Sequence, residues 1–188
     1  LPAEAIRDQA LAISGLLVER LGGPSVRPYQ PAGLWKELSG GEDYKADKGE
    51  NLYRSSLYTF WKRTAPPPAM AVFDAAGRET CIVRATRTSS PLQALNLMND
   101  VTYLEASRVF AERMMERGGP TPTSRLTYGF RRATARRPTS QEREILLGSL
   151  ARYLAKYQKD RDAATKFVSQ GELERNKRFD VGELAAYT

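Results

Sequence analysis

The sequence contains no histidine and a single cysteine among its 188 residues. Without histidine, the chain has no Ser-His-Asp or Cys-His nucleophile system, no histidine general base, and no histidine ligand for zinc, copper or haem. With Cys81 alone, it has no internal disulfide, no cysteine-based structural zinc site and no c-type haem attachment motif. The sequence therefore predicts no metal and no cofactor held by this chain itself.

Long apolar runs are also lacking. No stretch approaches the ~20 apolar residues that a membrane-spanning helix needs. The N-terminal LPAEAIRD has neither the basic start nor the apolar core of a signal peptide. Because the first residue is Leu1 and not Met, we expect the chain to be a piece of a longer protein or a processed product.

Positive charge is in modest excess, with 29 Lys and Arg against 22 Asp and Glu and a formal net charge of +7. This balance favours an acidic partner such as nucleic acid, an anionic glycan, an acidic protein or anionic lipid headgroups. The basic residues form only short clusters, such as Arg131 with Arg132 and Arg136 with Arg137, and no run resembles a polybasic tail. Nucleic-acid binding is a hypothesis that charge alone supports, without a recognised motif.

Helical periodicity is clear in the first 21 residues. Apolar residues at three- and four-residue spacings predict an amphipathic helix from Pro2 to Leu21. Between residues 22 and 89, proline and glycine predict a long and largely irregular segment, with short helical turns at 34–38 and 69–73. Residues 52–62 fit a helix or a strand, and we favour a helix because the neighbouring segments are helical.

The clearest helix start is at Ser90, a good N-cap residue. Pro91 suits the first helical position and Gln93 completes a capping box. We expect one continuous helix from there to the Gly-Gly-Pro at residues 118–120. Further helices are expected at 124–135, from Thr139 onward with Glu142 as its capping-box partner, at 160–169 and at 181–188.

These patterns predict a mainly α fold. We expect residues 1–188 to form a single helical domain with one core, in which the irregular segment 22–89 wraps a helical bundle formed by the rest. Residues 90–188 supply most of that bundle. The sequence contains no internal repeat and no low-complexity tract.

Residues 53–100 have an unusual composition that points to a family. The string SLYTFWKRTAPPPAMAVFDAAGRETCIVRATRTSSPLQALNLMND resembles the signature of a planctomycete-specific domain of unknown function. The resemblance continues in LPAEAIRDQALAISGLL before it and in RLTYGFRRATARRPTSQERE and GELAAYT after it, so it covers nearly the whole chain. Two departures are mild: Ser89-Ser90-Pro91 stands where the family usually has Asn-Thr-Pro, and Val101 stands where a proline usually follows Asn-Asp.

The resemblance implies a context more than an activity. Such domains occur near the C-terminus of large planctomycete and verrucomicrobial proteins, which often carry a c-type cytochrome domain at their N-terminus. The resemblance therefore implies an exported, extracytoplasmic or periplasmic protein, in which upstream domains of the same polypeptide are the partners and hold any haem. It supplies no catalytic residue. We expect this chain to be a non-enzymatic structural or interaction module.

Arginines supply the first candidate site. Guanidinium forks bind carboxylate, sulfate or phosphate groups in a bidentate manner. The alternative is that these arginines hold the irregular segment together by donating hydrogen bonds to its backbone carbonyls and pairing with nearby carboxylates. The candidates for an anion site are Arg54, Arg63, Arg78, Arg84 and Arg87.

Trp61 and Trp35 are candidates for stacking on the rings of a ligand, and the alternative is that both belong to the core. Together with the arginines, they motivate a second function hypothesis, the binding or hydrolysis of an anionic polysaccharide. Hydrolysis requires two carboxyl groups ~5–10 Å apart, and no spacing in the sequence selects such a pair. We expect Cys81 to be an inert buried thiol, although neighbouring arginines would raise the reactivity of an accessible one.

Overall fold

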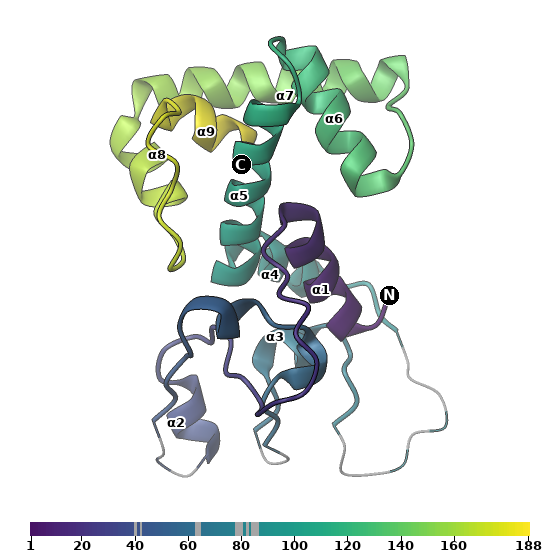
Figure 1. The fold of residues 1–188 in the computed structure, drawn as a ribbon, viewed down its shortest axis with the longest axis vertical. Helices are drawn as coiled ribbons and strands as arrows, with labels where there is room; N and C mark the ends of the chain where they lie inside the picture. Colours follow the sequence, from purple (N-terminus) through teal and green to yellow (C-terminus); the bar gives the residue numbers. More distant parts are fainter. Residues whose placement is uncertain (40, 42, 63–64, 78–80, 82, 84–86) are drawn as a thin grey trace. The chain divides into compact units, whose positions relative to one another are not determined.

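The computed structural model describes residues 1–39, 41, 43–62, 65–77, 81, 83 and 87–188 (Figure 1). Over these residues the protein is mainly α, as the sequence predicts, with nine α-helices, isolated bridges and no β-sheet. Within that part of the chain, no helix is both long and apolar enough to cross a membrane. The helices are α1 (Ala3–Ser14), α2 (Leu34–Ser39), α3 (Pro68–Val72), α4 (Pro91–Asn99), α5 (Val101–Arg117), α6 (Pro122–Thr134), α7 (Ser140–Lys159), α8 (Arg161–Val168) and α9 (Val181–Tyr187).

The chain forms two compact units. Unit 1 comprises Leu1–Ala12 and Leu16–Tyr103, and unit 2 comprises Ile13–Gly15 and Leu104–Thr188. The expectation of a single domain, in which one segment wraps one bundle, stays a prediction.

Unit 1 has two small clusters of buried apolar side chains. In the first, Ala3 of α1 packs with Met70 of α3, Phe73 and Tyr103. The second gathers Leu11 of α1 with two buried side chains of the irregular segment, Leu52 and Tyr53. Because α1 contributes a buried residue to each, it connects the two clusters.

The expected N-terminal helix is shorter than the sequence pattern indicates. It ends at Ser14 and not at Leu21, because Gly15 has a φ of +80°, a left-handed conformation that commonly ends helices. The backbone N–H groups of Leu16 and Leu17 both donate to the carbonyl of Leu11. Leu17 is partly buried and packs against the cluster of Leu11 from the irregular residues that follow α1, while Leu21 is exposed.

The helix favoured for residues 52–62 is also wrong. Two short 3-10 helices, η1 (Gly49–Tyr53) and η2 (Ser56–Tyr58), occupy this region. Its backbone pairs with distant chain: Val18 N–H donates to the Tyr53 carbonyl, and Phe60 N–H donates to the Val26 carbonyl. These long-range partners replace the hydrogen bonds that a helix would have made within the segment.

Helix starts were better predicted. The capping boxes at Ser90 with Gln93 and at Thr139 with Glu142 are both confirmed. The prediction of one continuous helix from Ser90 to residue 118 is wrong, because the helix is interrupted at Asp100, which has extended backbone angles. The Asp100 carboxylate accepts a hydrogen bond of 2.8 Å from the Thr102 N–H, so a new helix, α5, starts there.

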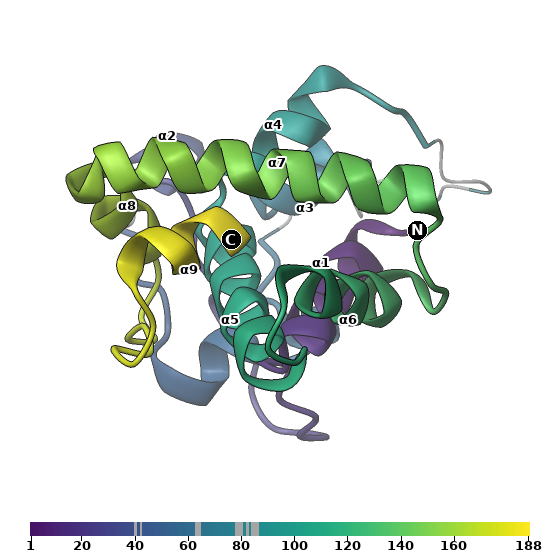
Figure 2. The ribbon, with the colours of Figure 1, turned by 90° about the horizontal axis from the view of Figure 1, so that it is seen from above.

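An apolar cluster in unit 2 is formed by side chains of α5, α7, α8 and α9. Figure 2 shows α7 as a long helix with α9 beside it and α8 at its C-terminal end, and these helices contact one another. The expected helices at 124–135, 160–169 and 181–188 are present as α6, α8 and α9, with small differences at their ends. The buried side chains of the cluster are Ala111, Met115, Tyr157, Ala164, Val168, Val181, Leu184 and Ala185.

Candidate functional site

Arg54 is a candidate anion ligand that the structure places in the interior of unit 1, fully buried. Its guanidinium donates to the backbone carbonyls of Pro24 at 2.9 Å, Arg20 at 3.0 Å, and Gly22. The same group lies 3.9 Å from the ring centroid of Tyr58. Arg54 thus holds the loop at residues 20–24, and binding an external anion would require these carbonyls to be released.

Arg7 is a second buried arginine, which sequence reasoning missed. Its guanidinium donates to the carbonyls of Leu52 at 2.6 Å and Arg54 at 2.9 Å, and to the Ser56 hydroxyl at 3.2 Å. Burial lowers the pKa of Arg7, and the charge of Asp8 opposes this shift. The sequence signal was its position on the buried face of α1, four residues from Leu11.

Of the other four arginines of the predicted anion site, the structure describes only Arg87. Arg87 is exposed. Arg63, Arg78 and Arg84 lie outside the part of the chain that the structure describes. An anion site built from the five predicted arginines therefore stays a prediction.

Trp35 is buried, with only 5% of its surface exposed. Its ring packs at centroid distances of 5.2 Å from Tyr44 and 6.0 Å from Phe60. Stacking of Trp35 on a ligand would require this packing to open. Trp61 is half-buried and packs against the apolar cluster of unit 1 that contains Met70.

Cys81 is exposed, so the expectation of a buried thiol is wrong. Hydrolysis would require a pair of free carboxylates, but Asp74 and Glu105 both have structural partners. Asp74 accepts hydrogen bonds from the Thr88 backbone and hydroxyl, at 2.7 and 2.8 Å, and these bonds lower its pKa. In unit 2, Glu105 is buried and accepts a 2.7 Å hydrogen bond from the Leu173 N–H. In the described part of the chain, no group of three or more Cys, Asp or Glu side chains is arranged to hold a metal ion.

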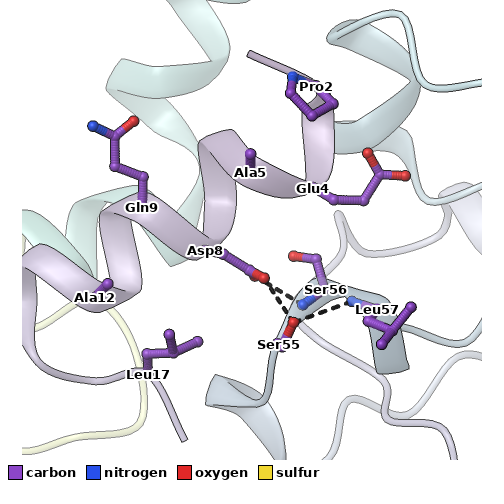
Figure 3. Close-up of a pocket in the computed structure, with 10 residues that line it drawn as sticks. All are labelled: Pro2, Glu4, Ala5, Asp8, Gln9, Ala12, Leu17, Ser55, Ser56 and Leu57. Carbon is purple, nitrogen blue, oxygen red and sulfur yellow. Dashed lines mark hydrogen bonds between the residues drawn. The ribbon is translucent and has the colours of Figure 1, made fainter. Parts of the chain in front are cut away.

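An open groove with a volume of about 590 Å³ runs beside α1 in unit 1 (Figure 3). Asp8 points from α1 toward the opposite wall, where it accepts hydrogen bonds from the Ser55 hydroxyl at 2.7 Å and the Ser56 N–H at 2.8 Å. Both carboxylate oxygens are thus engaged, and much of the remaining lining is apolar. The groove is lined by Pro2, Glu4, Ala5, Asp8, Gln9, Ala12, Leu17, Ser55, Ser56 and Leu57.

Helix α4 of unit 1 exposes several large apolar side chains. None of its nine residues is buried. Leu92, Leu95, Leu97 and Met98 have exposed fractions of 56%, 55%, 42% and 65%, and we call these four side chains the α4 leucine surface. The helix carries no charged residue, whereas a solvated helix normally presents polar and charged residues on its outer face.

Polar contacts fix where the α4 leucine surface begins. Ser90 and Gln93 form the capping box at the N-terminus of α4. The Gln93 side-chain amide also donates a 3.0 Å hydrogen bond to the Val72 carbonyl at the end of α3. These contacts hold α4 in place through its first turn and do not use the α4 leucine surface. That surface is therefore available for contact with a partner. Leu92, Leu95 and Met98 follow one another at three-residue spacings and share one face of α4, and exposed apolar faces of this kind commonly mark interaction sites.

Comparison with known proteins places the chain in a family. The model of PSD1, described as a protein of unknown function (DUF1553), matches residues 1–150, and the chain belongs to this family. No curated protein matches the sequence. No solved structure matches it either.

Proposed function

We propose that this member of the DUF1553 family is a non-enzymatic interaction module, which docks onto another domain of the same polypeptide through the α4 leucine surface. The observation that carries the proposal is the exposure of four large apolar side chains on a helix of nine residues. Full burial of such a side chain is worth about 1.5–3 kcal/mol. A partner that covers them therefore gains several kcal/mol before the costs of association are counted.

A domain of the same polypeptide is the partner that best fits so small a surface. A nine-residue helix offers less area than a stable complex between separate proteins usually buries. Covalent connection raises the effective concentration of the partner. A weak affinity, which a titration of the separate domains at high concentration still measures, is therefore sufficient. The resemblance of the chain to C-terminal parts of planctomycete-type proteins supports an exported, extracytoplasmic parent protein, in which an upstream cytochrome c domain holds the haem.

The proposal is tested by supplying the partner domains separately. We expect the double variant Leu95→Gln/Met98→Gln to keep the melting temperature of this chain, because both side chains are exposed. The same variant should bind the remainder of the parent polypeptide at least about tenfold more weakly, in a calorimetric titration.

The matched control is Ile145→Gln, which removes an apolar side chain that is 61% exposed on α7. It should leave the affinity unchanged. Equal affinities for the wild type and the α4 double variant would overturn the proposal. A lower melting temperature of the double variant would instead indicate that α4 packs within unit 1.

A further inference from the structure

Most of the positive charge of the chain lies in unit 2. Within the boundaries of the two units, unit 2 has 17 Lys and Arg against 11 Asp and Glu, a formal charge of +6. Unit 1 has 12 against 11, a formal charge of +1. An anionic partner is therefore attracted mainly by unit 2.

A groove with a volume of about 580 Å³ collects part of this charge. Arg117 comes from the last turn of α5, and Arg131 and Arg132 come from the last turn of α6. The residues that line the groove include no carboxylate. We call it the arginine groove, and its lining is Arg117, Gly118, Ser124, Thr127, Tyr128, Arg131, Arg132 and Ala135.

The three arginines of the groove differ from others in the same unit. Arg125 pairs with Glu183 at 2.7 Å, and Arg161 pairs with Asp180 at 2.5 Å. Among the described residues, the guanidinium groups of Arg117, Arg131 and Arg132 have neither an ion-pair partner nor a hydrogen-bond acceptor. Their donors are free to bind a ligand.

Close helix packing fixes the walls of the arginine groove. Gly118 follows α5, and a Cβ atom added to it would lie 2.6 Å from the Cα of Arg125 in α6. A Cβ atom added to Gly129 of α6 would lie 2.6 Å from the sulfur of Met114. The two helices thus approach at contact distance, and the side chains of the groove project from a rigid frame. Such pre-organisation lowers the entropy cost of binding.

The groove combines three kinds of recognition group. One face of α6 carries Tyr128 together with Arg131 and Arg132, which lie three and four residues after it. Guanidinium forks donate pairs of hydrogen bonds to carboxylate or sulfate groups. The Thr127 hydroxyl donates to the Thr123 carbonyl at 2.7 Å, which leaves its oxygen as an acceptor for a ligand hydroxyl. The Tyr128 ring offers an aromatic face to an apolar ring face.

Two alternative explanations account for less of this arrangement. Cations in the last turn of a helix favour its dipole by a modest amount, but that role requires neither a groove nor an aromatic ring beside them. Nucleic-acid grooves combine a long basic track with several aromatic side chains on which successive bases stack. The arginine groove has one aromatic side chain and three arginines.

We infer that the arginine groove is a binding site for an acidic polysaccharide, whose carboxylate or sulfate groups pair with Arg117, Arg131 and Arg132 while a sugar ring lies against Tyr128. This site is separate from the α4 leucine surface, which belongs to unit 1, and the inference does not depend on the proposed docking function.

Calorimetric titration of the whole chain tests the inference, with heparin oligosaccharides as the sulfated probe and oligogalacturonates as the carboxylated probe. The variant Arg131→Gln/Arg132→Gln should lose at least about tenfold in affinity for the probe that binds. Arg131→Lys/Arg132→Lys keeps the charge and removes the forks, so it should lose part of that affinity. Tyr128→Leu should weaken binding without changing its salt dependence.

The matched control is Arg143→Gln/Arg178→Gln, which removes the same charge from two exposed positions outside the groove. It should change the affinity by less than about twofold. Binding of neither glycan would overturn the inference. So would an equal loss of affinity in the groove variant and the control, or tighter binding of a DNA oligonucleotide than of either glycan, because both results indicate non-specific attraction to charge.

Discussion

The guanidinium of Arg7 donates a 2.9 Å hydrogen bond to the backbone carbonyl of Arg54, which lies 47 residues further along the chain. Arg54 in turn donates its own side-chain hydrogen bonds to the carbonyls of residues 20, 22 and 24. The two buried arginines therefore connect three segments of unit 1. Arg7 connects α1 to η1 and to residue 54, and Arg54 connects that residue to the loop that follows α1. Together they satisfy carbonyl groups that an irregular segment cannot pair within itself.

Replacement of Arg7 should destabilise unit 1 strongly. Arg7→Met keeps much of the side-chain volume but leaves the acceptors on Leu52, Arg54 and Ser56 unsatisfied in the interior. Each buried unsatisfied group costs about 1–3 kcal/mol, so we expect the free energy of unfolding to fall by at least about 3 kcal/mol. Urea unfolding followed by tryptophan fluorescence measures it, since Trp35 and Trp61 both lie in unit 1.

The control for this prediction is Arg87→Met, at an exposed position. Its effect should stay within about 0.5 kcal/mol, as is usual for surface substitutions. If Arg7→Met and Arg87→Met unfold at the same urea concentration as the wild type, the buried arginines do not hold unit 1 together.

Local signals in the sequence predicted helix starts well. The errors have two causes: local signals that apolar periodicity concealed, and long-range contacts. Ser90, Pro91 and Gln93 specify a helix start by contacts within four residues, and that start is where the sequence places it. The break at Asp100 has a local cause, an N-cap carboxylate, but the apolar periodicity that runs across it concealed the signal.

The irregular part of unit 1 was harder to predict. The 3-10 turns near Tyr53 depend on partners at Arg7 and Val18, which no local pattern in residues 52–62 reveals. The same holds for the candidate site. The arginine groove exists because Gly118 and Gly129 let two helices approach closely, and in the sequence Arg131 and Arg132 were only a short basic cluster.

Asp100 should make unit 1 less stable as the pH rises. Burial raises the pKa of its carboxyl group, against the opposing effects of the hydrogen bonds from Thr102 and the charge of Arg7. A raised folded-state pKa means that the folded protein binds the proton more tightly than the unfolded chain. The resulting stabilisation is complete below the unfolded-state pKa of about 3.9 and is lost as the pH rises through the folded-state value.

Asp100→Asn removes this titration and keeps an acceptor for the Thr102 N–H. We expect the variant to be more stable than the wild type at neutral pH, with a difference that shrinks as the pH is lowered. Melting temperatures of the two proteins across the acidic range measure the difference. A constant difference at every pH would show that Asp100 does not titrate with a raised pKa.

Glu142 should give the opposite dependence at the start of α7. Hydrogen bonds from Arg136 and from the Thr139 backbone lower the pKa of Glu142 to about 2. A depressed folded-state pKa contributes stability above the unfolded-state value of about 4.3, and this stability is lost as the pH falls through about 2. The Thr139 N–H donates to the Glu142 carboxylate at 2.8 Å, so its hydrogen exchange reports the contact.

In Glu142→Gln, the capping box can still form, but the charge that Arg136 binds is lost. We expect exchange at Thr139, corrected for the intrinsic rate, to accelerate below about pH 4 in the wild type and to be independent of pH in the variant. Identical pH profiles in the two proteins would exclude a stabilising role for the ionised carboxylate.

Two glycines should respond to alanine in opposite directions. Gly15 has a φ of +80°, and a Cβ atom there would collide with the guanidinium of Arg113, so Gly15→Ala combines backbone strain with a steric clash. We expect it to lower the free energy of unfolding by at least about 1 kcal/mol. Gly148 lies inside α7, and a Cβ atom there would meet nothing within 4 Å.

Gly148→Ala should therefore raise the free energy of unfolding by about 0.5–1 kcal/mol, because alanine loses less conformational entropy than glycine on entering a helix. Thermal unfolding of both variants, followed by circular dichroism at helical wavelengths, measures the two shifts. The pair is informative because the chemical change is the same and only the surroundings differ. A stabilising Gly15→Ala would mean that α1 continues past Ser14, as the spacing of Leu17 and Leu21 had indicated.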